Sequence, residues 1–68
     1  MNWIEYFEHV LANVRMTREE FFQIYNLPDD ERAKEEERLY EEETNKYGDY
    51  MHLLIAYKGY LKEEGKKQ

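Results

Sequence analysis

YGDYMHLLIAYKGYL, residues 47–61, is the stretch of the sequence that decides the fold. If this stretch forms an α-helix, its tyrosines, leucines, methionine and isoleucine cover well over half of the circumference of the helix. A helix that is apolar on so many sides must be buried on more than one of them. The stretch therefore predicts a central helix that packs against several neighbours.

The helical period of this stretch continues upstream into a strongly charged segment. One heptad frame places the leucines and tyrosines at its inner positions, and in that frame Glu36 and Glu43 also occupy inner positions. Glutamates at inner positions are typical of a helix that is surrounded by water. Gly48 and Gly59 fall at outward positions, where glycine costs about 1 kcal/mol without disturbing packing. We predict one long helix over 28–64, and the alternative favoured by the local capping signals is a break at Gly48.

Two shorter helices are expected before this long one. Asn2 is a strong N-cap in front of an amphipathic pattern, which predicts a helix over 2–14. A capping box formed by Thr17 and Glu20 predicts a second helix over 17–25. The fold class is therefore all-α, a small helical bundle with two short N-terminal helices packed on one long C-terminal helix.

The chain has 68 residues, which is enough for one domain over 1–68 and close to the size at which a single core struggles to stabilise a fold. It contains no cysteine, so disulfides and thiolate zinc sites are excluded. The longest apolar run, 53–57, is far shorter than the roughly 20 residues needed to span a bilayer, and the N-terminus lacks a signal-peptide pattern. We expect a cytoplasmic protein without a membrane partner, with a frayed polar tail over 65–68.

No residue pattern indicates catalysis, a metal or another cofactor. The sequence has no serine and no cysteine, which excludes the two commonest nucleophiles, and capping accounts for Thr17. His9 and His52 each have a carboxylate one turn away, but carboxylate-bridged metal bundles need several more inward-facing acids. We predict that the protein is not an enzyme.

The formal charge of −6 is concentrated in the segment 29–45, which holds nine acids against three bases. This distribution argues against direct binding of nucleic acid, which requires clustered lysine and arginine, and favours a partner with a basic surface. The remaining alternatives are a nucleic-acid mimic and a helix face that is merely solvated. The predicted partner-binding acidic face consists of Asp29, Asp30, Glu35, Glu37, Glu41 and Glu42.

Tyrosine is the most informative residue type of the sequence. It buries a large apolar ring, keeps a hydroxyl that needs a partner, and is enriched at protein interfaces. A chain of this size without disulfides also gains stability from association. We favour a homodimer over a stripe that serves only the core. The predicted dimer interface consists of Tyr47, Tyr50, Leu54, Tyr57 and Leu61.

The pattern of residues in the N-terminal half of the chain is similar to that of known proteins. The chain resembles small acidic helical proteins encoded by phages and prophages of Gram-positive bacteria, tail assembly chaperones among them. The resemblance lies in Trp3 and Tyr6, in the segment 16–22 with its threonine cap, and in the turn 27–32. The resemblance implies a small binding protein from a mobile element that inhibits a host defence protein by direct contact. A second implication is a role in phage assembly.

Overall fold

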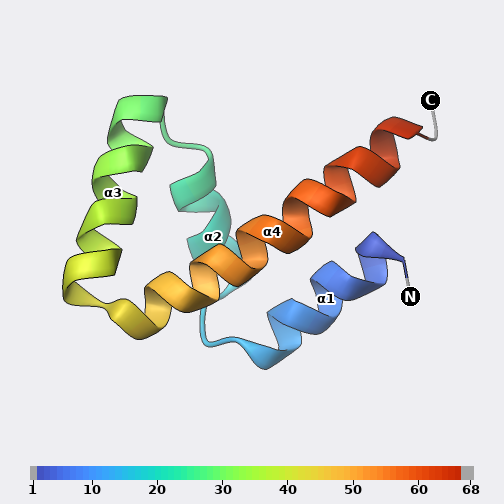
Figure 1. The fold of residues 1–68 in the computed structure, drawn as a ribbon, viewed down its shortest axis with the longest axis horizontal. Coiled ribbons are helices and arrows are strands. Elements are labelled where there is room, and N and C mark those ends of the chain that lie inside the picture. The colour runs from blue at the N-terminus through green and yellow to red at the C-terminus, as the bar shows by residue number, and fades with distance from the viewer. Residues whose placement is uncertain (1, 67–68) are drawn as a thin grey trace.

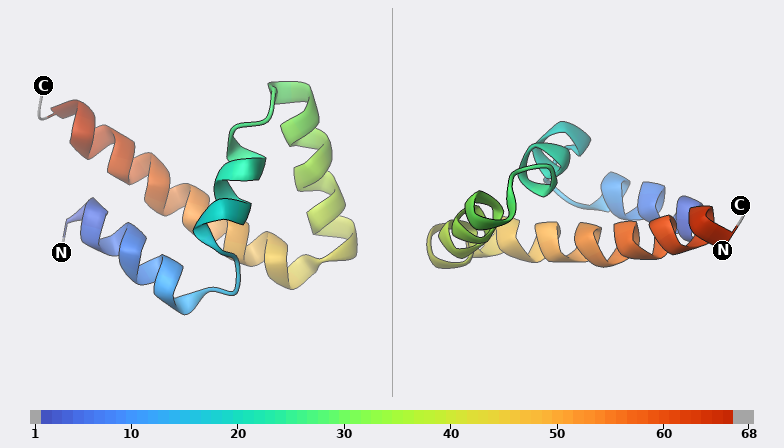
Figure 2. Two further views of the ribbon diagram at one scale, coloured as in Figure 1. Left: turned by 180° about the vertical axis from the view of Figure 1, so that it is seen from behind. Right: turned by 90° about the horizontal axis from the view of Figure 1, so that it is seen from above.

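The computed structural model describes residues 2–66, and every regular element within that range is a helix. The elements are α1 (Trp3–Asn13), α2 (Arg18–Tyr25), α3 (Asp29–Glu42) and α4 (Thr44–Lys66). α1 and α4 run antiparallel to each other, and α3 rises from the start of α4 (Figure 1). Viewed from above, α4 forms one side of the molecule and α2 lies on the opposite side (Figure 2). The all-α class is confirmed.

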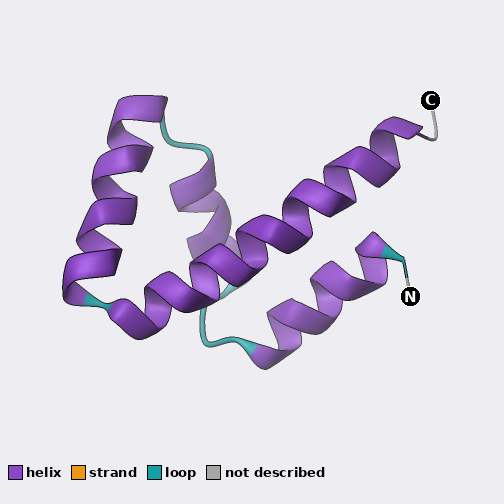
Figure 3. Ribbon diagram, in the orientation of Figure 1, coloured by secondary structure: helices purple, strands orange, loops and turns teal. Residues whose placement is uncertain are grey.

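The prediction of one long helix over 28–64 was wrong. The chain leaves helical geometry at Glu43, whose φ is −138° and ψ 65°, and α4 begins at the next residue (Figure 3). The alternative break at Gly48 was wrong as well, because Gly48 lies inside α4. Arg38 stabilises the bend by donating to the Glu43 carboxylate at 2.9 Å.

Packing of α3 against α4 explains why the chain bends. Leu39 is buried at 2% exposure, and the hydroxyl of the fully buried Tyr50 donates to Glu36 at 2.6 Å. A straight helix would return Leu39 to water and separate the hydrogen-bonded pair. Burial of one leucine side chain contributes about 1.5–3 kcal/mol, which outweighs the helix propensity of a few residues.

The predicted helix starts are confirmed. The side-chain oxygen of Asn2 accepts a hydrogen bond from the Glu5 amide at 2.8 Å. Thr17 and Glu20 form the full capping box, with the Glu20 amide donating to the threonine hydroxyl at 3.1 Å. α4 extends to Lys66, so the start of the tail predicted as frayed is helical, and 67–68 lie outside the described residues.

The core lies where α1, α2 and α4 meet, with α3 closing one end. Phe21 of α2 is fully buried at its centre and contacts aromatic rings from all three of these helices. Gly59 is also buried, beneath the indole of Trp3, so its predicted outward position was wrong. The buried hydrophobic residues are Phe7, Val10, Met16, Phe21, Leu39, Tyr50, Leu53 and Ala56.

Candidate functional site

The acidic residues predicted to bind a partner divide into two sets on α3. One set points toward arginines of the same helix. Asp29 lies 3.5 Å from Arg32, and Glu35 and Glu42 both contact Arg38. Each of these three carboxylates therefore has an arginine of its own helix beside it.

The other set lies on the side of α3 that faces away from α4. Asp30, Glu37 and Glu41 are exposed, and none of the ion pairs between residues 2 and 66 includes them. Tyr40 lies next to them at 61% exposure, the most exposed large hydrophobic side chain in the described part of the chain. We call Asp30, Glu37, Tyr40 and Glu41 the outer face of α3.

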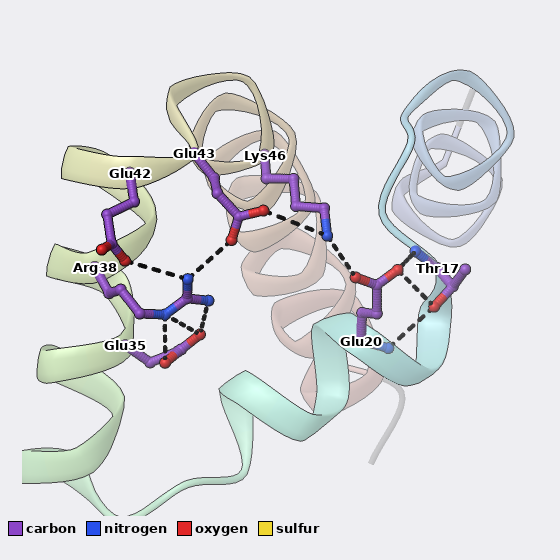
Figure 4. A network of polar contacts seen from close by, with 7 residues as sticks. All are labelled: Thr17, Glu20, Glu35, Arg38, Glu42, Glu43 and Lys46. Atoms are coloured by element: carbon purple, nitrogen blue, oxygen red, sulfur yellow. Dashed lines mark hydrogen bonds and ion pairs between the residues drawn. The ribbon is translucent and has the colours of Figure 1, made fainter.

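A polar network holds α3 in place from its other side. Arg38 donates from Nε to Glu35 at 3.1 Å and from Nη1 to Glu43 at 2.9 Å (Figure 4). The hydrogen bond from Arg38 holds the pKa of Glu35 below its ordinary value. Because Glu43 is the residue at which the helix breaks, this arginine ties the end of α3 to the start of α4.

Lys46 extends the network to α2. Its ammonium group lies 3.3 Å from Glu20 and 3.8 Å from Glu43 (Figure 4). The backbone amide of Thr17 and, after it, Lys46 hold the pKa of Glu20 below its ordinary value. One lysine thereby joins the capping box of α2 to the bend. The network has a structural task, and its carboxylates are engaged within the chain.

The residues of the predicted dimer interface also divide into two sets. Tyr50 is fully buried in the core of its own chain, so it cannot belong to a surface between copies. Tyr57 is half-buried against α2, with its ring 5.2 Å from that of Phe22 and 5.1 Å from that of Tyr25. Burial raises the pKa of Tyr57. Tyr50 and Tyr57, two of the five residues of the predicted dimer interface, therefore serve the fold.

The remaining predicted interface residues lie at the edge of the buried side of α4. Tyr47 and Leu54 are half-buried against the core, and Leu61 is 42% exposed. Met51 and Lys58 fall between them on the same side, so the spacing alternates between four and three residues, which is the spacing of a helix–helix seam. The heptad frame of the sequence missed this spacing because it placed Tyr50 and Tyr57, which pack in the core, in the interface between copies. The outer face of α4 consists of Tyr47, Met51, Leu54, Lys58 and Leu61, with Ile55 beside it at 58% exposure.

The two outer faces are continuous. The rings of Tyr40 on α3 and Tyr47 on α4 meet edge to face, with their centroids 5.2 Å apart. Such aromatic pairs contribute about 0.5–1.5 kcal/mol beyond their buried area. The acids beside Tyr40 therefore lie at the N-terminal end of the apolar outer face of α4.

A shallow apolar pocket opens beside this surface. Asn2, Trp3, Tyr6 and Ile55 line it, and its volume is about 240 Å³, below the roughly 300–1,000 Å³ of typical small-molecule sites. His52 lies next to it, with Nε2 3.0 Å from the Tyr6 hydroxyl. Within residues 2–66 no three histidine, cysteine or acidic side chains gather in a way that could hold a metal ion.

No protein-family model, no curated protein and no solved structure matches the chain. Among the described helices, none is both long enough and apolar enough to cross a bilayer. A functional assignment therefore rests on the outer faces of α3 and α4.

Proposed function

We propose that this protein is a non-catalytic binding module whose outer face of α3 contacts a basic surface on another protein. The observation that carries the proposal is the position of Asp30, Glu37 and Glu41, exposed and outside the ion pairs of residues 2–66, beside the most exposed aromatic ring. Desolvating these acids requires partners of opposite charge. A tyrosine within such a set supplies the apolar contact that interfaces favour.

The proposed partner is a host protein, and the proposed outcome of binding is inhibition by occlusion of its basic surface. The choice of a host defence protein as the partner is supported by the resemblance of the N-terminal residue pattern to small phage-encoded proteins. A role in phage assembly would use the same face on a different partner. Complementary charge would speed association and make the affinity fall as salt rises.

The module acts as a homodimer in this proposal. Its support is the apolar outer face of α4, which Leu61 and Ile55 leave open at 42% and 58% exposure. Two copies that share this face would present two outer faces of α3, and a doubled contact raises the effective affinity for a partner with two basic patches.

The acidic contact is tested by capture from a bacterial lysate with matched baits. Glu37→Gln/Glu41→Gln removes two charges from the outer face of α3. Glu5→Gln/Glu19→Gln removes two charges from exposed positions on α1 and α2. We expect the wild type and the control to retain a basic protein that high salt releases, and the α3 variant to lose it. Equal capture by both variants, or no salt-sensitive partner for any bait, would overturn the proposal.

A further inference from the structure

Leu54 is the middle residue of the outer face of α4. Tyr47 precedes it by seven residues and Leu61 follows it by seven, so both lie about 10.5 Å from it along the helix axis at 1.5 Å per residue. The stripe therefore has the same length on both sides of one central leucine. Two-fold dimers use such self-complementary surfaces, because each residue of the pair meets its counterpart across the axis.

The charges beside this stripe are not symmetric. Lys58 lies in the C-terminal half of the face and Lys62 one turn further on, both exposed and outside the ion pairs among the described residues. The N-terminal half adjoins Tyr40, which Glu37 and Glu41 flank on α3. One end of the surface is therefore basic and the other acidic.

From these two observations we infer that the second copy packs antiparallel, α4 against α4, with the two-fold axis at Leu54. The inference rests on the homodimer of the proposed function and adds its orientation. Tyr47 of one copy then meets Leu61 of the other. Lys58 and Lys62 of one copy approach the acids that flank Tyr40 on the other.

A parallel pair is unfavourable for the same reason. It would place Lys58 beside Lys58 and the acids of one α3 near those of the other, and like charges across an interface oppose association. In the antiparallel pair the aliphatic stem of Lys58 covers apolar surface while its ammonium group stays in water near the acidic end of the other copy. Charge therefore selects the orientation, and the apolar stripe supplies the contact.

Disulfide trapping tests the orientation, and the chain suits it because it has no cysteine of its own. Leu54→Cys, at the axis, should oxidise to a covalent dimer. A mixture of Tyr47→Cys and Leu61→Cys chains should yield the mixed 47–61 disulfide in several-fold excess over 47–47 and 61–61, because a disulfide needs Cα atoms within about 7 Å. Chance pairing would give as many mixed as like disulfides.

The outcomes separate the inference from the proposal beneath it. Light scattering that finds a monomer of the wild type at tens of micromolar refutes the homodimer and the orientation together. If the wild type is a dimer but the cysteine variants trap the 47–47 and 61–61 disulfides in excess, the antiparallel arrangement alone is refuted. A wild-type dimer whose Leu54→Cys variant does not cross-link, although it still dimerises under reducing conditions, shows that the copies meet elsewhere and likewise overturns the inference.

Discussion

The indole of Trp3 lies directly on the backbone of Gly59, where α1 crosses the C-terminal half of α4. A Cβ added at position 59 would overlap the benzene ring of the indole. The backbone amide of Trp3 also donates to Glu63 at 2.7 Å, one turn further along α4. This close approach fixes the start of α1 on α4.

Gly59→Ala should therefore destabilise the protein, by about 1–3 kcal/mol, as overpacking does. Gly48→Ala is the matched control, because nothing lies within 4 Å of a Cβ at position 48. There the better helix propensity of alanine should stabilise the fold by up to about 1 kcal/mol. Thermal unfolding measures both, and a Gly59→Ala variant as stable as the control would contradict the packing of Trp3 on Gly59.

The hydroxyl of Tyr50 should stabilise the packing of α3 on α4. Tyr50→Phe removes its hydrogen bond to Glu36, and we expect a loss of about 1–2 kcal/mol in urea unfolding at neutral pH. Tyr40→Phe is the control. Because Tyr40 is 61% exposed, this substitution should leave the stability unchanged. Equal effects of the two substitutions would show that the buried hydrogen bond contributes nothing.

The same tyrosine predicts a loss of stability at high pH. Burial, and after it the bond to Glu36, raise the pKa of Tyr50 above its ordinary value of 10.0. A raised folded-state pKa means that the stabilisation is fully present below pH 10.0 and is lost as pH rises through the raised value. The stability difference between the wild type and Tyr50→Phe should therefore shrink as pH rises above 10.0. A constant difference would contradict this linkage.

The helix starts were predictable from the sequence because their causes are local. Asn2 and the capping box at Thr17 satisfy amides within three residues of themselves. The end of α3 was not predictable in this way. No glycine or proline marks Glu43, and the bend follows from contacts between residues far apart in the sequence, such as Tyr50 with Glu36.

The two outer faces were only partly predictable for a related reason. The sequence predicted that the stretch 47–61 is apolar over well over half of its helical circumference, but periodicity alone does not say which side α1 and α2 cover. Tyr50 is fully buried in the core, and Tyr57 packs against it. Tyr47 and Leu54 lie half-buried at the edge of the core, and Leu61 is exposed. The acids of α3 divide by their spacing from the arginines of the same helix, because Asp29, Glu35 and Glu42 each lie three or four residues from Arg32 or Arg38.

Acid should destabilise the protein in part through Glu20. Because the pKa of Glu20 is lowered from 4.5 in the folded state, its stabilisation is present above pH 4.5 and is lost as pH falls through the lowered value. Glu20→Gln keeps an oxygen acceptor for the cap and loses the charge. The stability of this variant should therefore fall less than that of the wild type between pH 7 and about pH 3.

Glu19→Gln is the control for the acid experiment, since Glu19 is exposed and makes no contact in the network of Lys46. It should lose stability on acidification as the wild type does. Urea unfolding at both pH values measures the three proteins. If Glu19→Gln and Glu20→Gln respond alike, the contacts of Glu20 with Thr17 and Lys46 do not govern the acid response.

A charge at the end of the outer face of α4 should separate the two copies without unfolding them. Leu61→Glu replaces a side chain that is 42% exposed in a single copy, so the helical circular dichroism should not change. In the antiparallel pair the new carboxylate would lie against the apolar ring of Tyr47 and near the acids that flank Tyr40, and it would lose hydration without gaining a cation. We expect the dimer dissociation constant to rise at least tenfold, which corresponds to about 1.4 kcal/mol.

His9→Glu adds the same charge at an exposed site on α1 and should leave association unchanged. Sedimentation equilibrium compares the two, and equal dissociation constants would exclude Leu61 from the contact between copies.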